Sequence, residues 1–238
     1  MTEIRNYKTA EDVAQAAAEN AVEILQLAIE TKGSASWVLA GGTSPMLAYK
    51  KLVKDFSDAL DWSKVTVLIG DERMVPLDHK DSNYGTILSL FDKNVELSKV
   101  KRIIPDTTVH VLAAAEDYAA KIIAENIIEF DLVWLGVGED GHTLSLFPGN
   151  VAFTEPTESW VIPVYDSPKA PSERITLSLK ALEYVDELVI FAVGASKQDA
   201  LKAARLKRLL PISVASDVVE SNGGEVRWLY DDAAWNDD

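Results

Sequence analysis

The chain has 238 residues, of which 38 are acidic and 23 are basic, and it carries a formal net charge of −15 at pH 7 with no cysteine. This acidity argues against binding to nucleic acid or an anionic membrane, and the lack of cysteine excludes disulfides and thiolate chemistry. The sequence contains no apolar run of about 18 residues and no signal-like start, so we expect one cytoplasmic domain over residues 1–238.

Helical and strand patterns alternate along the chain. Residues 9–33 predict a helix, with Thr9 and Asp12 as a capping box and Gly33 at the end. Apolar strands are expected at 36–40, 64–70, 130–138, 159–165, 175–179, 187–194 and 225–230. Further helices are expected at 45–54, near 84–91, and at 113–128 and 196–206, the last capped by Ser196, while residues 71–85 are expected to form a loop.

Apolar strands separated by helices are typical of a parallel sheet that is covered on both faces. We therefore predict an α/β fold of the three-layer α/β/α, Rossmann-like type, with a mostly parallel sheet. Ligands of such sheets bind beyond the carboxyl ends of the strands. Four marked segments follow predicted strands: "GGTS" at 41–44, "GDER" at 70–73, "GEDGH" at 138–142 and "GASK" at 194–197. We expect them to share one site.

The loop after the strand at 130–138 allows two interpretations. Residues 136–141 spell G-x-G-x-x-G, the fingerprint of dinucleotide-binding proteins, and the acidic Asp166 follows at a suitable distance. That fingerprint must open a long helix, but only one or two turns fit before Pro148. The alternative is that the glycines present His142 as a catalytic base, because imidazole titrates near neutral pH. We favour this second interpretation and expect the other two histidines to lie on the surface.

These segments resemble the motifs of the 6-phosphogluconolactonases. The stretch "LGVGEDGHTLSLFPG" is similar to the loop G-x-G-x-D-G-H-x-A-S-L-F-P-G of that family, and differs from it by Leu144 in place of alanine. Further similar stretches are "AGGTSP", "DERMVPLDHKDSN", "SERITLSL" and "GASKQDAL", and the matches run in order from Ala40 to Ala234.

The resemblance implies hydrolysis of 6-phospho-D-glucono-1,5-lactone to 6-phospho-D-gluconate in the oxidative pentose phosphate pathway, with no cofactor. His142 would be the general base that activates water, Asp140 would orient its ring or cap the turn that follows, and Gly138 and Gly141 would bring the loop close to the substrate. The sequence has no His/Glu cluster at metal-ligand spacing, so we expect no metal. A G-x-S-x-G elbow, which would present a serine nucleophile, does not occur either.

The substrate implied by the resemblance carries a phosphate, which needs donors and positive charge. Gly41, Gly42 and Thr43 can supply N–H groups at a helix N-terminus, where the hydroxyls of Thr43 and Ser44 add donors. Lys197 begins a helix after a strand end and can reach the same anion. An ordinary strand-to-helix turn and a solvated lysine are the alternatives.

Two arginines and one asparagine complete the expected site. Arg73 can bind phosphate or polarise the lactone carbonyl, or it can pair with a neighbouring carboxylate. Arg174 has the same options, and the sequence leaves open which arginine contacts which group. Asn83 is expected to donate to a sugar hydroxyl or to organise its loop.

Three other functions compete with a lactonase. Glucosamine-6-phosphate deaminases/isomerases share the D-G-H loop, but theirs continues I-A-F-N-E-P-G and their second motif favours D-E-Y over D-E-R. A non-catalytic sugar-phosphate sensor is expected to have a DNA-binding segment ahead of the sensor, where this chain has a short acidic region. A dinucleotide-dependent dehydrogenase comes last. We expect a small-molecule partner, no nucleic acid or membrane partner, and a monomer or homodimer.

Overall fold

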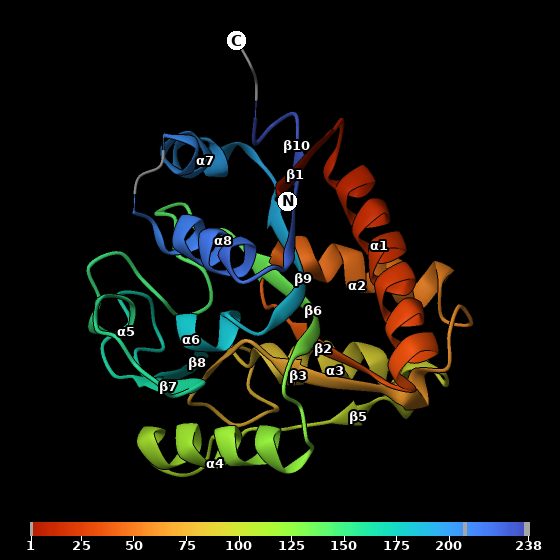
Figure 1. The fold of residues 1–238 in the computed structure, drawn as a ribbon, viewed down its shortest axis with the longest axis horizontal. Helices are drawn as coiled ribbons and strands as arrows, with labels where there is room; N and C mark the ends of the chain where they lie inside the picture. The colour runs from red at the N-terminus through yellow and green to blue at the C-terminus, as the bar shows by residue number, and fades with distance from the viewer. Residues whose placement is uncertain (1, 207–208, 236–238) are drawn as a thin grey trace.

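The computed structural model describes residues 2–206 and 209–235. Its centre is a seven-stranded parallel sheet with helices on both faces, as Figure 1 shows. The order across the sheet is β1 (Thr2–Tyr7), β10 (Glu225–Asp231), β9 (Val185–Ala192), β6 (Phe130–Gly136), β2 (Ala35–Leu39), β3 (Val65–Ile69) and β5 (Lys101–Arg102). The predicted three-layer α/β/α, mostly parallel architecture is confirmed.

The helices form the outer layers. They are α1 (Ala10–Lys32), α2 (Thr43–Asp55), α3 (Asn83–Phe91), α4 (Val111–Ala124), α5 (Val151–Thr154), α6 (Leu179–Leu182), α7 (Gln198–Arg205) and α8 (Pro211–Ser221). Short 3-10 helices occur at η1 (Trp62–Lys64), η2 (Leu97–Lys99) and η3 (Ala195–Lys197). Helices α1 and α2 pack together on one face, whereas α8 covers β9 and β10 on the other (Figure 1). No helix in residues 2–206 and 209–235 is long and apolar enough to cross a membrane.

The ends of two helices test the predicted caps. Thr9 and Asp12 form both hydrogen bonds of a capping box on α1, and Gly33 closes that helix in the left-handed conformation. The cap expected at Ser196 is wrong, because η3 comes first and Lys197 is the residue that precedes α7.

A second, three-stranded antiparallel sheet corrects the expected assignment of two segments. It is made of β4 (Asp71–Arg73), β8 (Arg174–Leu177) and β7 (Val161–Val164), in that order. The chain after β3 was expected to be a loop, but β4 pairs with β8, and β7 joins this small sheet instead of the parallel one. Strand β4 is defined by its pairing with β8, because a segment of three residues is too short to show the alternating pattern of a strand. Helix α4 packs on β7 and β8.

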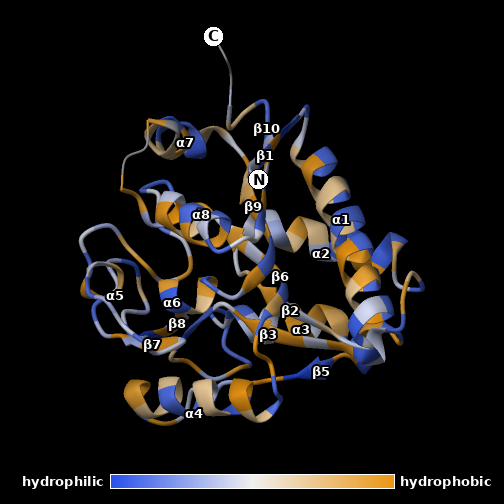
Figure 2. Ribbon diagram, in the orientation of Figure 1, coloured by the Kyte–Doolittle hydropathy of each residue, from blue (hydrophilic) through white to orange (hydrophobic). Residues whose placement is uncertain are grey.

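The sequence patterns did not predict the two edge strands or α8. Strand β1 contains two apolar residues and β5 none, because an edge strand buries little side-chain area and is held by backbone pairing. Figure 2 shows β5 as a hydrophilic segment at the margin of the fold.

An aromatic cluster fixes α2 against the sheet. Trp37 and Trp134 meet edge to face at 4.8 Å between ring centroids, and Tyr49 of α2 stacks on Trp134 at 4.9 Å. The Tyr49 hydroxyl accepts from the Ala40 amide and donates to the Ala40 carbonyl oxygen. The core thereby sets the position of the turn that follows β2.

Candidate active site

A cavity of about 340 Å³ lies at the carboxyl edge of the parallel sheet, beside the small sheet. Every predicted site residue lines it except Asp140 and Gly141. The predicted residues that line it are Gly41, Gly42, Thr43, Ser44, Arg73, Asn83, Gly138, His142, Arg174 and Lys197. The strand-end segments therefore meet in one place, as the fold rule for parallel sheets requires.

The loop after β6 forms a tight turn and opens no helix. The Gly138 amide donates to the His142 carbonyl oxygen at 2.8 Å, and the Gly141 amide donates to the Gly138 carbonyl oxygen at 3.0 Å. The next helix in the chain is α5, which begins at Val151. The dinucleotide fingerprint lacks the helix it needs. These two glycine amides close the loop on itself, and Gly138 also lines the cavity.

Gly138 makes room for the His142 ring. A Cβ atom at this position would lie 1.9 Å from His142 Nδ1, so only glycine lets the ring fold back over the loop. The His142 ring also stacks on Phe147, with 4.5 Å between centroids. The imidazole is thus held on two sides.

Asp140 touches the His142 ring although it does not line the cavity. Its Oδ1 atom bonds His142 Nδ1. Because a carboxylate is an acceptor, it holds the ring proton at Nδ1 and leaves the Nε2 lone pair free. Burial lowers the pKa of His142 below its ordinary value, and Asp140 opposes this effect. The ring is therefore neutral and basic near neutral pH.

The Arg174 guanidinium forms its hydrogen bonds with neighbouring loops of the protein, although the residue also lines the cavity. This arginine is 3% exposed. Its Nε donates to the Pro171 carbonyl at 2.9 Å and its Nη2 to the Lys169 carbonyl at 2.7 Å, while Nη1 lies 3.4 Å from Ser145 Oγ. Ser145 in turn donates to Asp71 Oδ2 at 2.6 Å. Arg174 therefore connects the β7–β8 loop to the loop after β6 that carries His142 and Ser145, called the histidine loop below.

Arg73 keeps more of its guanidinium available. Its Nη1 donates to the Asp81 carbonyl at 2.7 Å, whereas its buried Nε has no partner within the described part of the chain. The alternative of a pairing between this guanidinium and the neighbouring carboxylate of Asp71 or Glu72 does not occur among the described residues, and Glu72 accepts from the Arg73 backbone amide instead. Of the two arginines, Arg73 keeps more donors for a ligand, because Arg174 uses three of its five N–H groups in these bonds and Arg73 uses one.

Glu72 organises the start of α3. Its buried carboxylate accepts from the backbone amides of Arg73, Asn83 and Tyr84 and from the Ser82 hydroxyl. Burial raises the pKa of Glu72, and the four donors oppose that rise. These bonds place Asn83 at the cavity, where a Cβ on Gly41 would come within 2.1 Å of Asn83 Oδ1. Gly41 thus permits the close approach of Asn83.

The turn into α2 forms an anion-binding geometry. Gly42 has a φ of 104° and precedes Thr43, the first helical residue. As a glycine it has no side chain to cap the helix, and the first turn carries no acidic residue. The first amides of a helix lack intrahelical partners, so those of Gly42, Thr43 and Ser44 offer donors beside the cavity.

The C-terminal segment holds the turn that carries Lys197. Buried Asp231 accepts from the amides of Gly194 and Ala234, each at 2.9 Å, and Gln198 donates to the Ala233 carbonyl. Burial lowers the pKa of Lys197. The negative charge of Glu139 opposes this lowering of the Lys197 pKa.

Several residues at the cavity were not expected from the sequence. Lys169, on the loop between β7 and β8, brings its Nζ to 3.4 Å from His142 Nδ1. Asp71 and Leu144 also line the cavity, and Leu144 occupies the left-handed region with a φ of 54°. The signal for Lys169 was its position between two prolines in "SPKAP", just ahead of the arginine motif.

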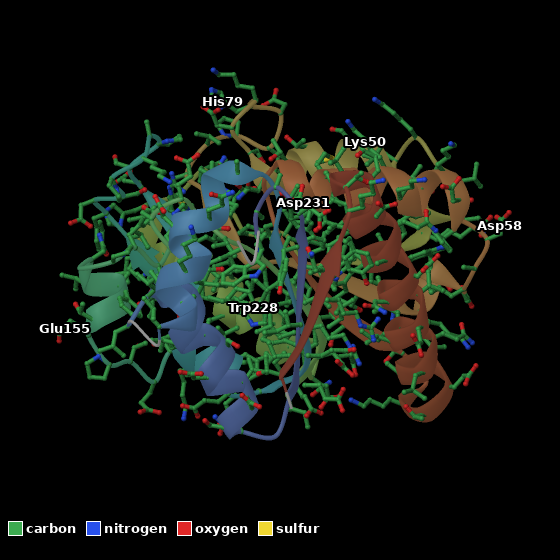
Figure 3. The ribbon with its side chains drawn as sticks, turned by 90° about the horizontal axis from the view of Figure 1, so that it is seen from above. Lys50, Asp58, His79, Glu155, Trp228 and Asp231 are labelled. Atoms are coloured by element: carbon green, nitrogen blue, oxygen red, sulfur yellow. The ribbon has the colours of Figure 1, made fainter. Side chains whose placement is uncertain are left out.

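The other two histidines lie away from this site, as expected. His79 lies at the periphery in Figure 3 and pairs with Asp81 on an exposed loop. His110 is exposed and caps α4, since its ring accepts from the Leu112 amide. Among residues 2–206 and 209–235, no group of three or more His, Asp or Glu side chains is arranged to hold a metal ion.

The sequence profile of the family "Glucosamine-6-phosphate isomerases/6-phosphogluconolactonase" matches residues 8–228. The chain belongs to this family. It is 35% identical over 208 residues to human 6-phosphogluconolactonase, covering 82% of this chain and 78% of that protein. It is 33% identical over 231 residues to the rat 6-phosphogluconolactonase, covering 93% and 86%.

Solved structures of 6-phosphogluconolactonases share the fold of this chain. The 6-phosphogluconolactonase of Thermotoga maritima superposes with a TM-score of 0.84 at 25% identity, covering 97% of this chain and 100% of that one. The 6-phosphogluconolactonase of Trypanosoma brucei superposes with a TM-score of 0.82 at 26% identity, covering 98% and 97%. Within the family, the lactonase branch is the one that these relatives represent.

Proposed function

We propose that the protein hydrolyses 6-phospho-D-glucono-1,5-lactone to 6-phospho-D-gluconate, with His142 as the general base. The observation that carries the proposal is the neutral His142 ring, fixed by Asp140 and Phe147, in a cavity that also contains a helix N-terminus with free amides. The named relatives act as supporting evidence for the choice of substrate.

The phosphate binds at the start of α2. The amides of Gly42, Thr43 and Ser44 and two hydroxyls donate to it, and Lys197 adds a positive charge across the cavity. Arg73 is assigned to the substrate because it retains a free donor, whereas Arg174 is assigned to the support of the site. Asn83 donates to the sugar hydroxyls.

Hydrolysis proceeds by addition of water to the lactone carbonyl carbon. His142 Nε2 takes a proton from the water as its oxygen bonds to that carbon, and the carbonyl electron pair moves to oxygen. The pair then returns, the bond between the carbon and the ring oxygen breaks, and the departing oxygen takes the proton from the imidazolium. No metal is assigned, because the described residues around the cavity provide no ligand cluster.

The test is the decay of freshly generated lactone in EDTA, followed against buffer alone, because the lactone also opens unaided. We expect acceleration by the wild type and loss of about 100-fold or more of kcat in His142→Ala. His110→Ala is the matched control and should keep full activity. A wild type without acceleration would refute the proposal, and glucosamine-6-phosphate would then be the next substrate assayed. An active His142→Ala would remove this base. The cytoplasmic location and the monomeric or homodimeric state remain predictions.

A further inference from the structure

Lys169 lines the cavity, and the reaction described above does not use it. Its Nζ lies 3.4 Å from His142 Nδ1 and 3.7 Å from Asp140 Oδ1, and its side chain is 48% exposed. It therefore stands beside the catalytic base while one side of its ammonium remains open to the cavity.

The backbone of Lys169 is held more firmly than that of an ordinary surface lysine. Its carbonyl accepts from Arg174 Nη2 at 2.7 Å and from Ser167 Oγ at 2.9 Å. Arg174 also binds the Pro171 carbonyl, and the Ser167 amide donates to the Ser172 carbonyl. The nearly buried Arg174 guanidinium thus donates two hydrogen bonds to the loop that carries Lys169.

The charges around His142 come from several elements. Asp140 lies on its own loop and Asp71 on β4, and both raise the pKa of His142, whereas Lys169 lowers it. Arg174 of β8 packs over Phe147, with 5.6 Å from its Cζ to the ring centroid, and Lys197 lies on η3. Among the cations of the described residues, Lys169 lies in direct contact with the imidazole, with its Nζ 3.4 Å from His142 Nδ1.

We propose that Lys169 is a further catalytic residue, whose ammonium donates to the lactone carbonyl oxygen as that oxygen becomes negative. This inference rests on the proposed function. The water on His142 Nε2 attacks a carbonyl placed beside the ring. Lys169 Nζ rests at Nδ1 of the same ring, so its half-exposed side chain rotates into the cavity to reach the oxygen that receives the electron pair. Lys169 keeps its three protons throughout the step, so its contribution is electrostatic. Arg174 is the positioning residue that holds it there.

The experiment compares kcat and KM of Lys169→Met, Lys169→Arg and the wild type. Loss of one oxyanion donor lowers kcat by about 100-fold, so we expect a fall of this size in Lys169→Met with little change in KM. Lys169→Arg should recover most of the loss because it keeps the charge. Lys93→Met, at an exposed lysine in the turn after α3, is the matched control and should behave as wild type.

The ring NMR titration of His142 supplies a readout that does not depend on turnover. Removal of the positive charge in Lys169→Met should raise the pKa of His142, and circular dichroism should match that of the wild type. An unchanged kcat, or a loss expressed in KM alone as for a phosphate-binding lysine, would overturn the inference. A wild type that does not hydrolyse the lactone would overturn the proposed function and this inference with it, whereas an active wild type with an active Lys169→Met would overturn only the inference.

Discussion

At the residue scale, two opposing effects determine the pKa of the His142 imidazole. Burial favours the neutral ring, while the Asp140 carboxylate favours the protonated one, and burial dominates. The same carboxylate fixes the tautomer, so its removal changes both the charge near the ring and the direction in which Nε2 points. These two roles can be separated by a pH profile.

We predict that kcat/KM of the wild type falls in acid with an apparent pKa below the ordinary histidine value of 6.5. In Asp140→Asn this acid limb should move to lower pH, because a negative charge that raises the pKa of His142 is gone, and kcat should fall about tenfold through lost orientation. Initial rates from pH 5 to 8 measure both effects. Asp78→Asn, an exposed residue on another loop, controls for loss of charge alone. A limb that moves to higher pH in Asp140→Asn would contradict the assignment.

At the scale of elements, the sequence predicted the parts whose signal is local. Continuous apolar runs revealed the central strands, and the "GGTS", "GEDGH" and "GASK" segments lie at a common cavity because parallel strands end at one edge. The capping box of α1 is equally local. Most of the candidate site was therefore within reach of the sequence.

The remaining features depend on contacts between distant segments. Strand β7 has the apolar pattern of a central strand, but its partner is β8 and not the parallel sheet. Lys169 carries no local mark of function, because the bonds to Arg174 that fix its loop exist only in the folded molecule. The unpartnered Nε of Arg73 likewise became visible only once the partner of each donor was known.

The turn that carries Lys197 depends on the end of β10. We predict that Asp231→Ala raises KM for the lactone about fivefold, a loss of about 1 kcal/mol, with little change in kcat, because the amides of Gly194 and Ala234 lose their shared acceptor. Asp231→Asn retains an acceptor oxygen and should lie near the wild type. Michaelis–Menten analysis of both variants, with thermal melts to confirm folding, measures the effect. Equal KM values in the wild type and Asp231→Ala would show that the turn of Lys197 keeps its conformation without Asp231.

On the scale of the whole molecule, a cationic cavity sits in a strongly acidic surface. Arg73, Lys169, Arg174 and Lys197 all line the cavity, although the chain carries a net charge of −15. The distant acidic groups repel an anionic substrate over long range, and salt screens this repulsion more effectively than the short contacts inside the site.

We therefore predict that kcat/KM rises about twofold when potassium chloride is increased from about 10 mM to about 150 mM. Chloride is chosen because sulfate and phosphate would compete at the start of α2. The rate of unaided lactone opening at each salt concentration is the control. A steep fall with salt would mean that the cations of the cavity, and not the acidic surface, govern the approach of the substrate.

The position of β10 has a consequence for synthesis of the chain. This strand lies between β1 and β9, and it joins the first residues of the chain to the rest of the sheet. Its last residue, Asp231, also sets the turn of Lys197. During translation, β1 leaves the ribosome before the other strands of this sheet and has no neighbour in it until β10 emerges. The nascent chain therefore gains a complete sheet and a complete cavity only after β10 has been made.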